Sequence, residues 1–254
     1  MKRTLLTTIA LTLAICSFGQ VAYFQYRAVP EDREAEFVEK ETKYWAKVAQ
    51  AAVDQGKMAT WSLWRKVGVT EEGAPNYVFV NTYESFEKAN PADVWTSENV
   101  KTMGVSPDMV ETNSFAKITF DYWLQIEDMV PGDYKYAIVN YAMPKSRGNF
   151  IEENKKLWKP MFEKNIKAGK MGMTSWGLMS VVYPGGSQAR FSALTWDGFD
   201  KISDVMNYLR YNPEGMDPDF QEVVSQSKMG EIMPEGGFEY SIVYELVKRI
   251  APNN

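Results

Sequence analysis

The chain has 254 residues, of which 45% are hydrophobic and 14% aromatic, so it can bury a substantial core and is neither disordered nor of low complexity. Its 28 lysines and arginines are scattered among 33 acidic residues, giving a net charge of −5. That balance disfavours nucleic acid and anionic membranes as partners.

The first 19 residues have the pattern of a secretory signal peptide. Two basic residues precede the apolar run 5–15, and small residues lie just before Gln20. We place cleavage before Gln20, which makes 1–19 the signal peptide and predicts an exported protein, periplasmic or extracellular. The apolar run is too short for a permanent anchor, and no later stretch reads as a transmembrane segment.

The single cysteine, Cys16, offers an alternative. Residues 13–16 resemble the bacterial lipoprotein signal, in which the cysteine is lipidated and becomes residue one. Ile15 stands where that signal has a small residue, so we favour simple secretion over lipoprotein anchoring. In both cases no cysteine remains for a disulfide, and the exported chain must be held together by its core.

Residues 21–126 alternate between strand-like and helix-like patterns. Between 37 and 52 apolar side chains recur at helical spacing, and Gly56 follows where a C-terminal cap belongs. A second helix after Phe86 is interrupted by Pro91. The predicted strands are 21–29, 60–67, 77–83 and 117–126.

Residues 136–247 repeat the pattern. A helix from 150 to 166 precedes Gly169, and Pro160 inside it predicts a kink. A clear amphipathic helix covers 199–209. The predicted strands are 136–143, 174–183, 189–195 and 238–247.

The two halves match at a constant offset of 113 residues. The matches include Phe37 with Phe150, Lys43 with Lys156, Trp45 with Trp158, 56–58 with 169–171, and 83–88 with 196–201. One register kept over such a distance indicates a duplicated domain. We therefore divide the chain into a first unit, 20–126, a connection, 127–135, and a second unit, 136–254.

Each unit reads as β-α-β-β-α-β, the order of the ferredoxin-like fold, whose sheet needs a partner on its uncovered face. With two fused units, the chain resembles the dimeric α+β barrel superfamily, most closely its NIPSNAP-like and antibiotic-biosynthesis-monooxygenase-like branches. The resemblance implies an α+β fold of two tandem units packed sheet to sheet, as a pseudo-twofold monomer or a homodimer. No active-site motif of that superfamily is matched, so catalytic residues stay unknown.

The residues that are missing exclude several chemistries. The chain has no histidine, which removes the commonest general base and the axial haem ligand expected of the haem-binding barrels of this fold. Without a cysteine in the exported chain, thiol nucleophiles, zinc and iron–sulfur sites are excluded as well. We therefore expect no cofactor, no haem and no transition metal.

The acidic residues suggest structural roles. Asp197 with Asp200, and Asp217 with Asp219, stand at expected helix starts, where carboxylates cap the helix, and this interpretation outweighs metal binding. The lysines and glutamates along 31–47 read as a solvated helix face.

The aromatic residues carry the positive signal. Trp45 and Trp158 lie on apolar helix stripes and are predicted to be packing residues. In the third strand of each unit, alternate residues point to opposite faces of the sheet. One set of alternate residues (one phase) suits packing under helices; in the first unit it is Val78, Val80 and Thr82. The opposite phase is predicted to face the barrel interior and supplies the candidate ligand-binding residues Tyr77, Asn81, Tyr83, Arg190 and Trp196.

These patterns leave three functions open. The leading hypothesis is an exported protein that binds a small apolar or aromatic molecule between its two sheets. The alternatives are a cofactor-independent oxygenase or isomerase, as the resemblance implies, and an interaction module whose barrel is filled by its own side chains.

Overall fold

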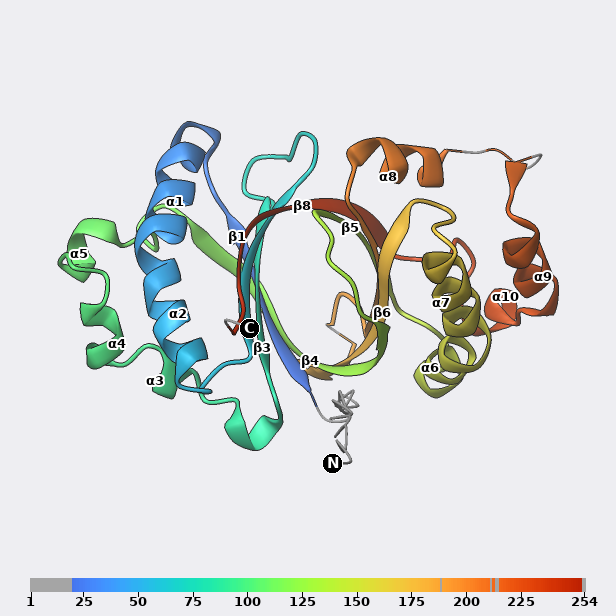
Figure 1. Cartoon of the computed structure of the whole chain (residues 1–254), viewed down its shortest axis with the longest axis horizontal. Helices are drawn as coiled ribbons and strands as arrows, with labels where there is room; N and C mark the ends of the chain where they lie inside the picture. The colour runs from blue at the N-terminus through green and yellow to red at the C-terminus, as the bar shows by residue number, and fades with distance from the viewer. Residues whose placement is uncertain (1–19, 188, 211, 213–214, 253–254) are drawn as a thin grey trace, which may run out of the picture.

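The computed structural model describes residues 20–187, 189–210, 212 and 215–252, so the predicted signal peptide and Cys16 lie outside the described residues. The strands are β1 (Val21–Ala28), β2 (Thr60–Lys66), β3 (Tyr77–Tyr83), β4 (Lys117–Val130), β5 (Tyr136–Ala142), β6 (Met173–Tyr183), β7 (Ala193–Phe199) and β8 (Tyr240–Ile250). They close into one antiparallel barrel in the order β1-β3-β2-β8-β5-β7-β6-β4 (Figure 1).

Helices flank the barrel on two opposite sides, with those of the first half on one side and those of the second half on the other (Figure 1). The first group comprises α1 (Glu34–Lys40), α2 (Ala46–Asp54), α3 (Pro91–Val94), α4 (Ser97–Lys101) and α5 (Pro107–Val110). The second comprises α6 (Arg147–Glu153), α7 (Lys159–Lys167), α8 (Ile202–Leu209), α9 (Pro218–Gln226) and α10 (Met229–Ile232). Within the described residues, no helix is long and apolar enough to cross a bilayer.

The two halves have the same strand order, β4-β1-β3-β2 in the first and β8-β5-β7-β6 in the second. They join edge to edge, because β2 pairs with β8 and β4 pairs with β6. The lumen is therefore enclosed by one continuous sheet rather than lying between two stacked sheets. β4 continues to Val130, four residues beyond its predicted end, and the chain passes to the second half through 131–135.

A π-helical turn interrupts the long helix of each half at equivalent places, Glu41–Trp45 and Asn154–Trp158. These turns are again 113 residues apart. Pro160 follows the second turn inside the same continuous helix, where it removes one backbone N–H from the hydrogen-bond ladder. The first half has Lys47 at the place of Pro160 and still has the π turn, so the proline is not the cause of the turn.

Three large hydrophobic clusters form most of the core, and a small fourth one, of Val48, Met103 and Val110, packs among the helices of the first half. Of the large clusters, one contains residues from all eight strands and fills the lumen, among them Phe24, Trp64, Tyr122, Leu194 and Trp196. The other two pack each half's helices on the outer face of the barrel, around Phe37 in the first half and Phe150 in the second. The barrel wall is thus apolar on both faces over much of its area.

The predicted orientation of β3 is wrong. Val78 faces the lumen, whereas Tyr77, Phe79 and Tyr83 pack outward against the helices. Both phases of β3 are apolar, so alternation alone could not orient the strand. The outward phase takes the large rings because small side chains of the facing helix, such as Ala49, leave room for them.

β7 begins four residues later than predicted and contains Asp197. Leu194 and Trp196 face the lumen as expected, but Asp197 is a buried strand residue, 4% exposed, and caps no helix. The predicted cap at Asp217 is confirmed, since its carboxylate accepts a hydrogen bond from the backbone N–H of Asp219 at 2.9 Å.

Candidate ligand-binding site

The lumen is packed. The hydroxyl of Tyr26 donates to that of Tyr141 at 3.0 Å, and the hydroxyls of Tyr141 and Tyr244 lie 3.2 Å apart, so these three buried hydroxyls satisfy one another. The indole N–H of Trp196, which also lies in the lumen, has no partner among the described residues. Neither of the two cavities described below opens into it. The lumen therefore holds the two halves together by packing.

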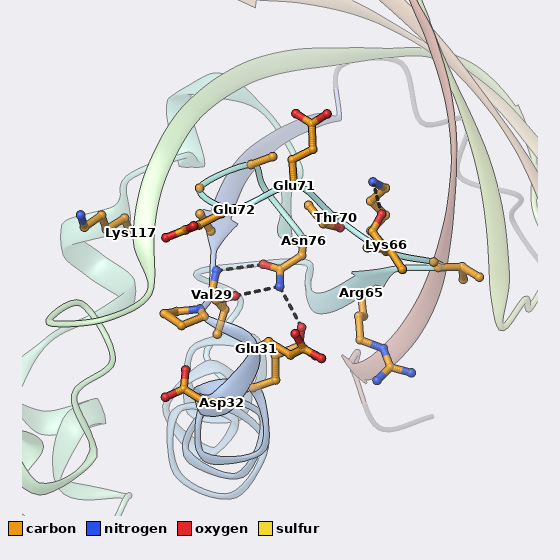
Figure 2. A pocket seen from close by; sticks show the side chains of 18 of the residues that line it. Val29, Glu31, Asp32, Arg65, Lys66, Thr70, Glu71, Glu72, Asn76 and Lys117 are labelled. Carbon is orange, nitrogen blue, oxygen red and sulfur yellow. Dashed lines mark hydrogen bonds between the residues drawn. The ribbon is translucent and has the colours of Figure 1, made fainter.

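The larger cavity is an open groove of about 920 Å³ between the loop 67–75 and the start of α1 (Figure 2). Charged side chains of both signs line it. Asn76 closes its floor, with its carbonyl accepting from Val29 N–H and its amide donating to Val29 O and to Glu34. These bonds tie the end of β1 to the start of α1. Among the described residues, no buried side-chain polar atom of this groove lacks a partner.

The smaller cavity, about 290 Å³, lies between the barrel wall of the first half and its helices. We call it the first-half pocket. Its lining is Tyr23, Gln25, Arg27, Glu41, Trp45, Trp61, Phe79, Asn81, Pro91, Trp95, Thr112 and Asn113. Aromatic walls surrounding a few polar groups are typical of small-molecule sites.

β1 supplies the polar side of this pocket. Its lumen phase is apolar, including Phe24 and Tyr26, but its outward phase carries Tyr23, Gln25 and Arg27. Polar side chains on a strand face covered by helices are exceptional, because an apolar residue would pack there at lower cost. This alternation is the sequence signal that could have identified the pocket.

Arg27 is buried, 8% exposed. Its Nε donates to the side-chain oxygen of Gln25, Oε1, at 2.8 Å. Its Nη1 donates to Asn113 Oδ1 at 2.7 Å and to the backbone carbonyl of Ala116 at 2.8 Å. Burial lowers the pKa of this guanidinium, and the nearby carboxyl of Glu41 partly opposes that change.

Glu41 opens the π turn, and the sequence interpretation of it as part of a solvated face is wrong, since it is only 6% exposed. It lies four residues after Phe37 on the face turned to the barrel. The Thr112 hydroxyl donates to its Oε1 at 2.7 Å. Burial raises the pKa of the Glu41 carboxyl to about 7, against the lowering effects of Thr112 and Arg27.

Two buried polar atoms of β3 have no hydrogen-bond partner in the described chain: the side-chain oxygen Oδ1 of Asn81 and the hydroxyl of Tyr83. Asn81 is 6% exposed and lines the pocket. Tyr23 is satisfied, because its hydroxyl donates to Asp121 at 2.6 Å; burial, followed by this hydrogen bond, raises its pKa to about 12.

The second half has no equivalent cavity among the two described. At the offset of 113, Arg27 and Glu41 correspond to Asn140 and Asn154. Strand pairing gives Asp197 and Phe199 as the counterparts of Phe79 and Asn81. The predicted match of 83–88 with 196–201 therefore does not hold in the structure, since Tyr83 packs against the helices and Trp196 lies in the lumen. A phenyl ring thus replaces the short amide, and Phe162 stacks on Trp176 at 5.7 Å between helix and barrel. These rings pack where the first half has smaller side chains beside its pocket, such as Ala49 at the place of Phe162.

The five residues predicted to form one site are dispersed. Tyr77 donates its hydroxyl to Glu34, Tyr83 packs under the helices, and Trp196 lies in the lumen. Arg190 precedes β7, is exposed, and covers the ring of Phe120 at 4.7 Å. Only Asn81 lines the first-half pocket, which the sequence analysis missed as a site.

Two tryptophans on helix-facing surfaces also line the pocket. Trp45 was predicted to be a packing residue, and Trp61, 1% exposed, belongs to the helix-side core. Each nevertheless presents part of its ring to the cavity. The Trp45 indole is fixed by donating to the carbonyl of Val110 at 2.9 Å.

Neither a protein-family model nor a curated protein sequence matches the chain. Solved structures do match in fold. An anthrone oxidase-like protein is 11% identical, with a TM-score of 0.57 over 93% of this chain and 94% of the other. A "putative monooxygenase" from Fusobacterium nucleatum is 11% identical, with a TM-score of 0.57 over 92% and 95%.

A chlorite dismutase variant from Candidatus Nitrospira defluvii is also similar, at 10% identity and a TM-score of 0.50 over 92% of each chain. At such identities the similarity concerns the course of the backbone and carries no residue roles. The chain thus shares with these structures the fold of an eight-stranded closed barrel flanked by helices, which agrees with the predicted resemblance to the dimeric α+β barrel superfamily.

Proposed function

We propose that this protein binds one small, largely aromatic molecule in the first-half pocket. The observation that carries the proposal concerns the side-chain amide oxygen of Asn81, Oδ1. This atom is buried at the wall of the cavity and has no hydrogen-bond partner in the described chain. A buried acceptor without a donor costs about 1–3 kcal/mol. A ligand that donates a hydrogen bond there would remove this cost.

The shape of the pocket supports an aromatic occupant. A volume of about 290 Å³ is near the lower end of the range for ligand pockets and suits a molecule of one or two rings. Trp45 and Trp95 meet edge to face at 5.9 Å, and Trp61 and Phe79 lie 5.7 Å apart, so ring faces and edges surround the space.

We also propose that the two halves are tandem copies of one ferredoxin-like unit, of which only the first retains a pocket. The shared strand order and the π turns at the same offset support the duplication. The filled second half then predicts one ligand per chain. Export, with cleavage before Gln20, remains part of the proposal and is tested by the N-terminal sequence of the protein purified from its host.

Binding is tested by tryptophan fluorescence and calorimetry with one- and two-ring aromatic compounds. Asn81→Ala removes the acceptor and should weaken binding about three- to tenfold, the effect of one hydrogen bond. Arg190→Ala changes an exposed side chain outside the pocket and should leave affinity unchanged. Binding that is insensitive to Asn81 but lost with Arg190 would place the site elsewhere, and no binding at all would favour a filled interaction module.

A cofactor-independent oxygenase or isomerase is the second candidate. It is favoured by Glu41, a buried carboxyl at the pocket wall whose pKa of about 7 suits proton transfer near neutrality. The names of two structural neighbours, an anthrone oxidase-like protein and a monooxygenase, are in keeping with it. Once a ligand is known, oxygen uptake that Glu41→Gln abolishes while binding persists would establish the enzyme.

A further inference from the structure

We propose that the occupant of the first-half pocket carries an anionic group, a carboxylate or a comparable acidic oxygen, which Arg27 attracts and which Glu41, in its protonated form, meets as a hydrogen-bond donor. This inference rests on the proposed function and specifies the chemical class of its ligand. It concerns the charge of the pocket, which the shape alone does not define.

The buried guanidinium of Arg27 is the first argument. Its three hydrogen bonds all go to neutral oxygens, those of Gln25, Asn113 and Ala116. In the part of the chain that the structure describes, no carboxylate forms an ion pair with it, and the nearest acidic influence is Glu41. A buried charge without a counterion is costly, so an anion beside Arg27 would be stabilised.

The carboxyl of Glu41 is the second argument. It lines the same pocket as Arg27 and has Thr112 as a hydrogen-bond donor. Near neutral pH it exchanges between the charged and the protonated form, so the Arg27–Glu41 pair carries a charge between zero and one positive unit. A bound anion would favour the protonated form, whose O–H could donate to it.

The other ionisable groups around that carboxyl do not alter the balance. On β1 and β4, Tyr23 donates to Asp121, and the phenol stays neutral because its pKa is raised to about 12. Beyond Thr112, Lys40 donates to the backbone carbonyl of Glu111. Arg27 therefore remains the charge that faces the pocket.

The aromatic walls alone would also suit an organic cation, because ring faces attract positive charge. Arg27 argues against such an occupant, since a second positive group in the same pocket would be repelled. A neutral ligand would leave the guanidinium without a counterion. Of the three charge classes, only the anion both supplies a counterion to Arg27 and accepts a hydrogen bond from protonated Glu41.

The experiment compares one- and two-ring aromatic carboxylates with their neutral amides and their aminomethyl isosteres, by calorimetry from pH 6.0 to 8.5 in two buffers of different ionisation enthalpy. The carboxylates should bind at least tenfold more tightly than the amides, and the amines most weakly. Because the complex requires protonated Glu41, carboxylate affinity should fall roughly 30-fold between pH 6.0 and 8.5, with nearly one proton taken up per ligand at pH 8.5.

Two variants isolate Glu41. Glu41→Gln mimics the protonated carboxyl, so it should abolish proton uptake and the pH dependence while retaining the preference for carboxylates. Asp197→Asn changes the other buried carboxyl with a pKa near 7, in the second half, and should leave proton uptake unchanged. Arg27→Gln should reduce the preference of carboxylate over amide to about twofold or less.

The outcomes separate the two proposals. Tighter binding of the amines, proton release on binding, or carboxylate binding with no pH dependence would overturn the anionic ligand while leaving an Asn81-dependent pocket in place. Should Arg27→Gln fail to fold, proton uptake by the wild type and its loss in Glu41→Gln decide the question. Failure of every compound to bind at any pH would overturn both the inference and the proposed function.

Discussion

Replacing Asp197 with asparagine should stabilise the protein strongly at pH 8. Asp197 lies in β7, is 4% exposed, and accepts a hydrogen bond from the Asn140 side chain at 2.9 Å. Burial raises the pKa of its carboxyl from 3.8 to about 7, with the hydrogen bond from Asn140 opposing. Above that pKa the folded protein holds a buried charge that the unfolded chain exposes to water.

The magnitude follows from linkage. Between pH 4 and 7 the folded state binds more protons than the unfolded state, so stability falls as pH rises through this range. At pH 8 the carboxyl costs about 4 kcal/mol, because each pKa unit corresponds to roughly 1.4 kcal/mol. At pH 5 the cost has decreased to about 2 kcal/mol. Asparagine keeps the shape and an acceptor for Asn140, but carries no charge.

Thermal and urea unfolding at pH 5 and pH 8 would measure this difference. Asp197→Asn should raise the melting temperature at pH 8 by on the order of 10 °C, with a smaller rise at pH 5. Asp200→Asn, a change to an exposed carboxylate just after β7, is the matched control and should have little effect. A variant that is less stable at pH 8, or equally shifted at both pH values, would refute the reasoning.

Two further comparisons test the packing. Trp45→Phe should lower the free energy of unfolding in urea by about 1 kcal/mol more than Trp158→Phe does. The reason is that the Trp45 indole donates to a backbone carbonyl, whereas the Trp158 indole N–H has no partner in the described chain. Equal losses would contradict this. Gly177→Ala should destabilise by about 1–3 kcal/mol, since its Cβ would lie 1.9 Å from the Trp196 ring, while Gly230→Ala, with nothing within 4 Å, should be nearly neutral by thermal melting.

Sequence reasoning recovered the elements whose pattern is local. The strands and the long helix of each half follow from residue type and period. The offset of 113 matches the π turns of the two long helices but not the third strands, where Tyr83 and Trp196 lie on opposite faces of the barrel wall. The orientation of β3 could not be derived, because both its phases are apolar and the choice depends on small side chains of a helix elsewhere in the chain. The closure of the barrel is likewise set by pairing between distant strands.

The site was harder to predict for a related reason. Glu41 lies among exposed charged neighbours in the sequence, and only the packing of its helix against β1 shows it to be buried. Asn81 was selected as a candidate for facing the lumen, but it lies on the outer face of the barrel. The signal that was available, polar residues Gln25 and Arg27 on the outward phase of β1, requires knowing which phase the helices cover.

Because the halves close edge to edge, we expect each half to depend on the other for its fold. Without β8 and β6, the strands β2 and β4 would lose hydrogen-bonding partners, and half of the lumen would open to water. The halves are thus related as the subunits of an obligate dimer are. The segment 131–135 contributes mainly by keeping the second half at a high effective concentration near the first, so that assembly of the barrel is an intramolecular event that does not depend on how dilute the protein is.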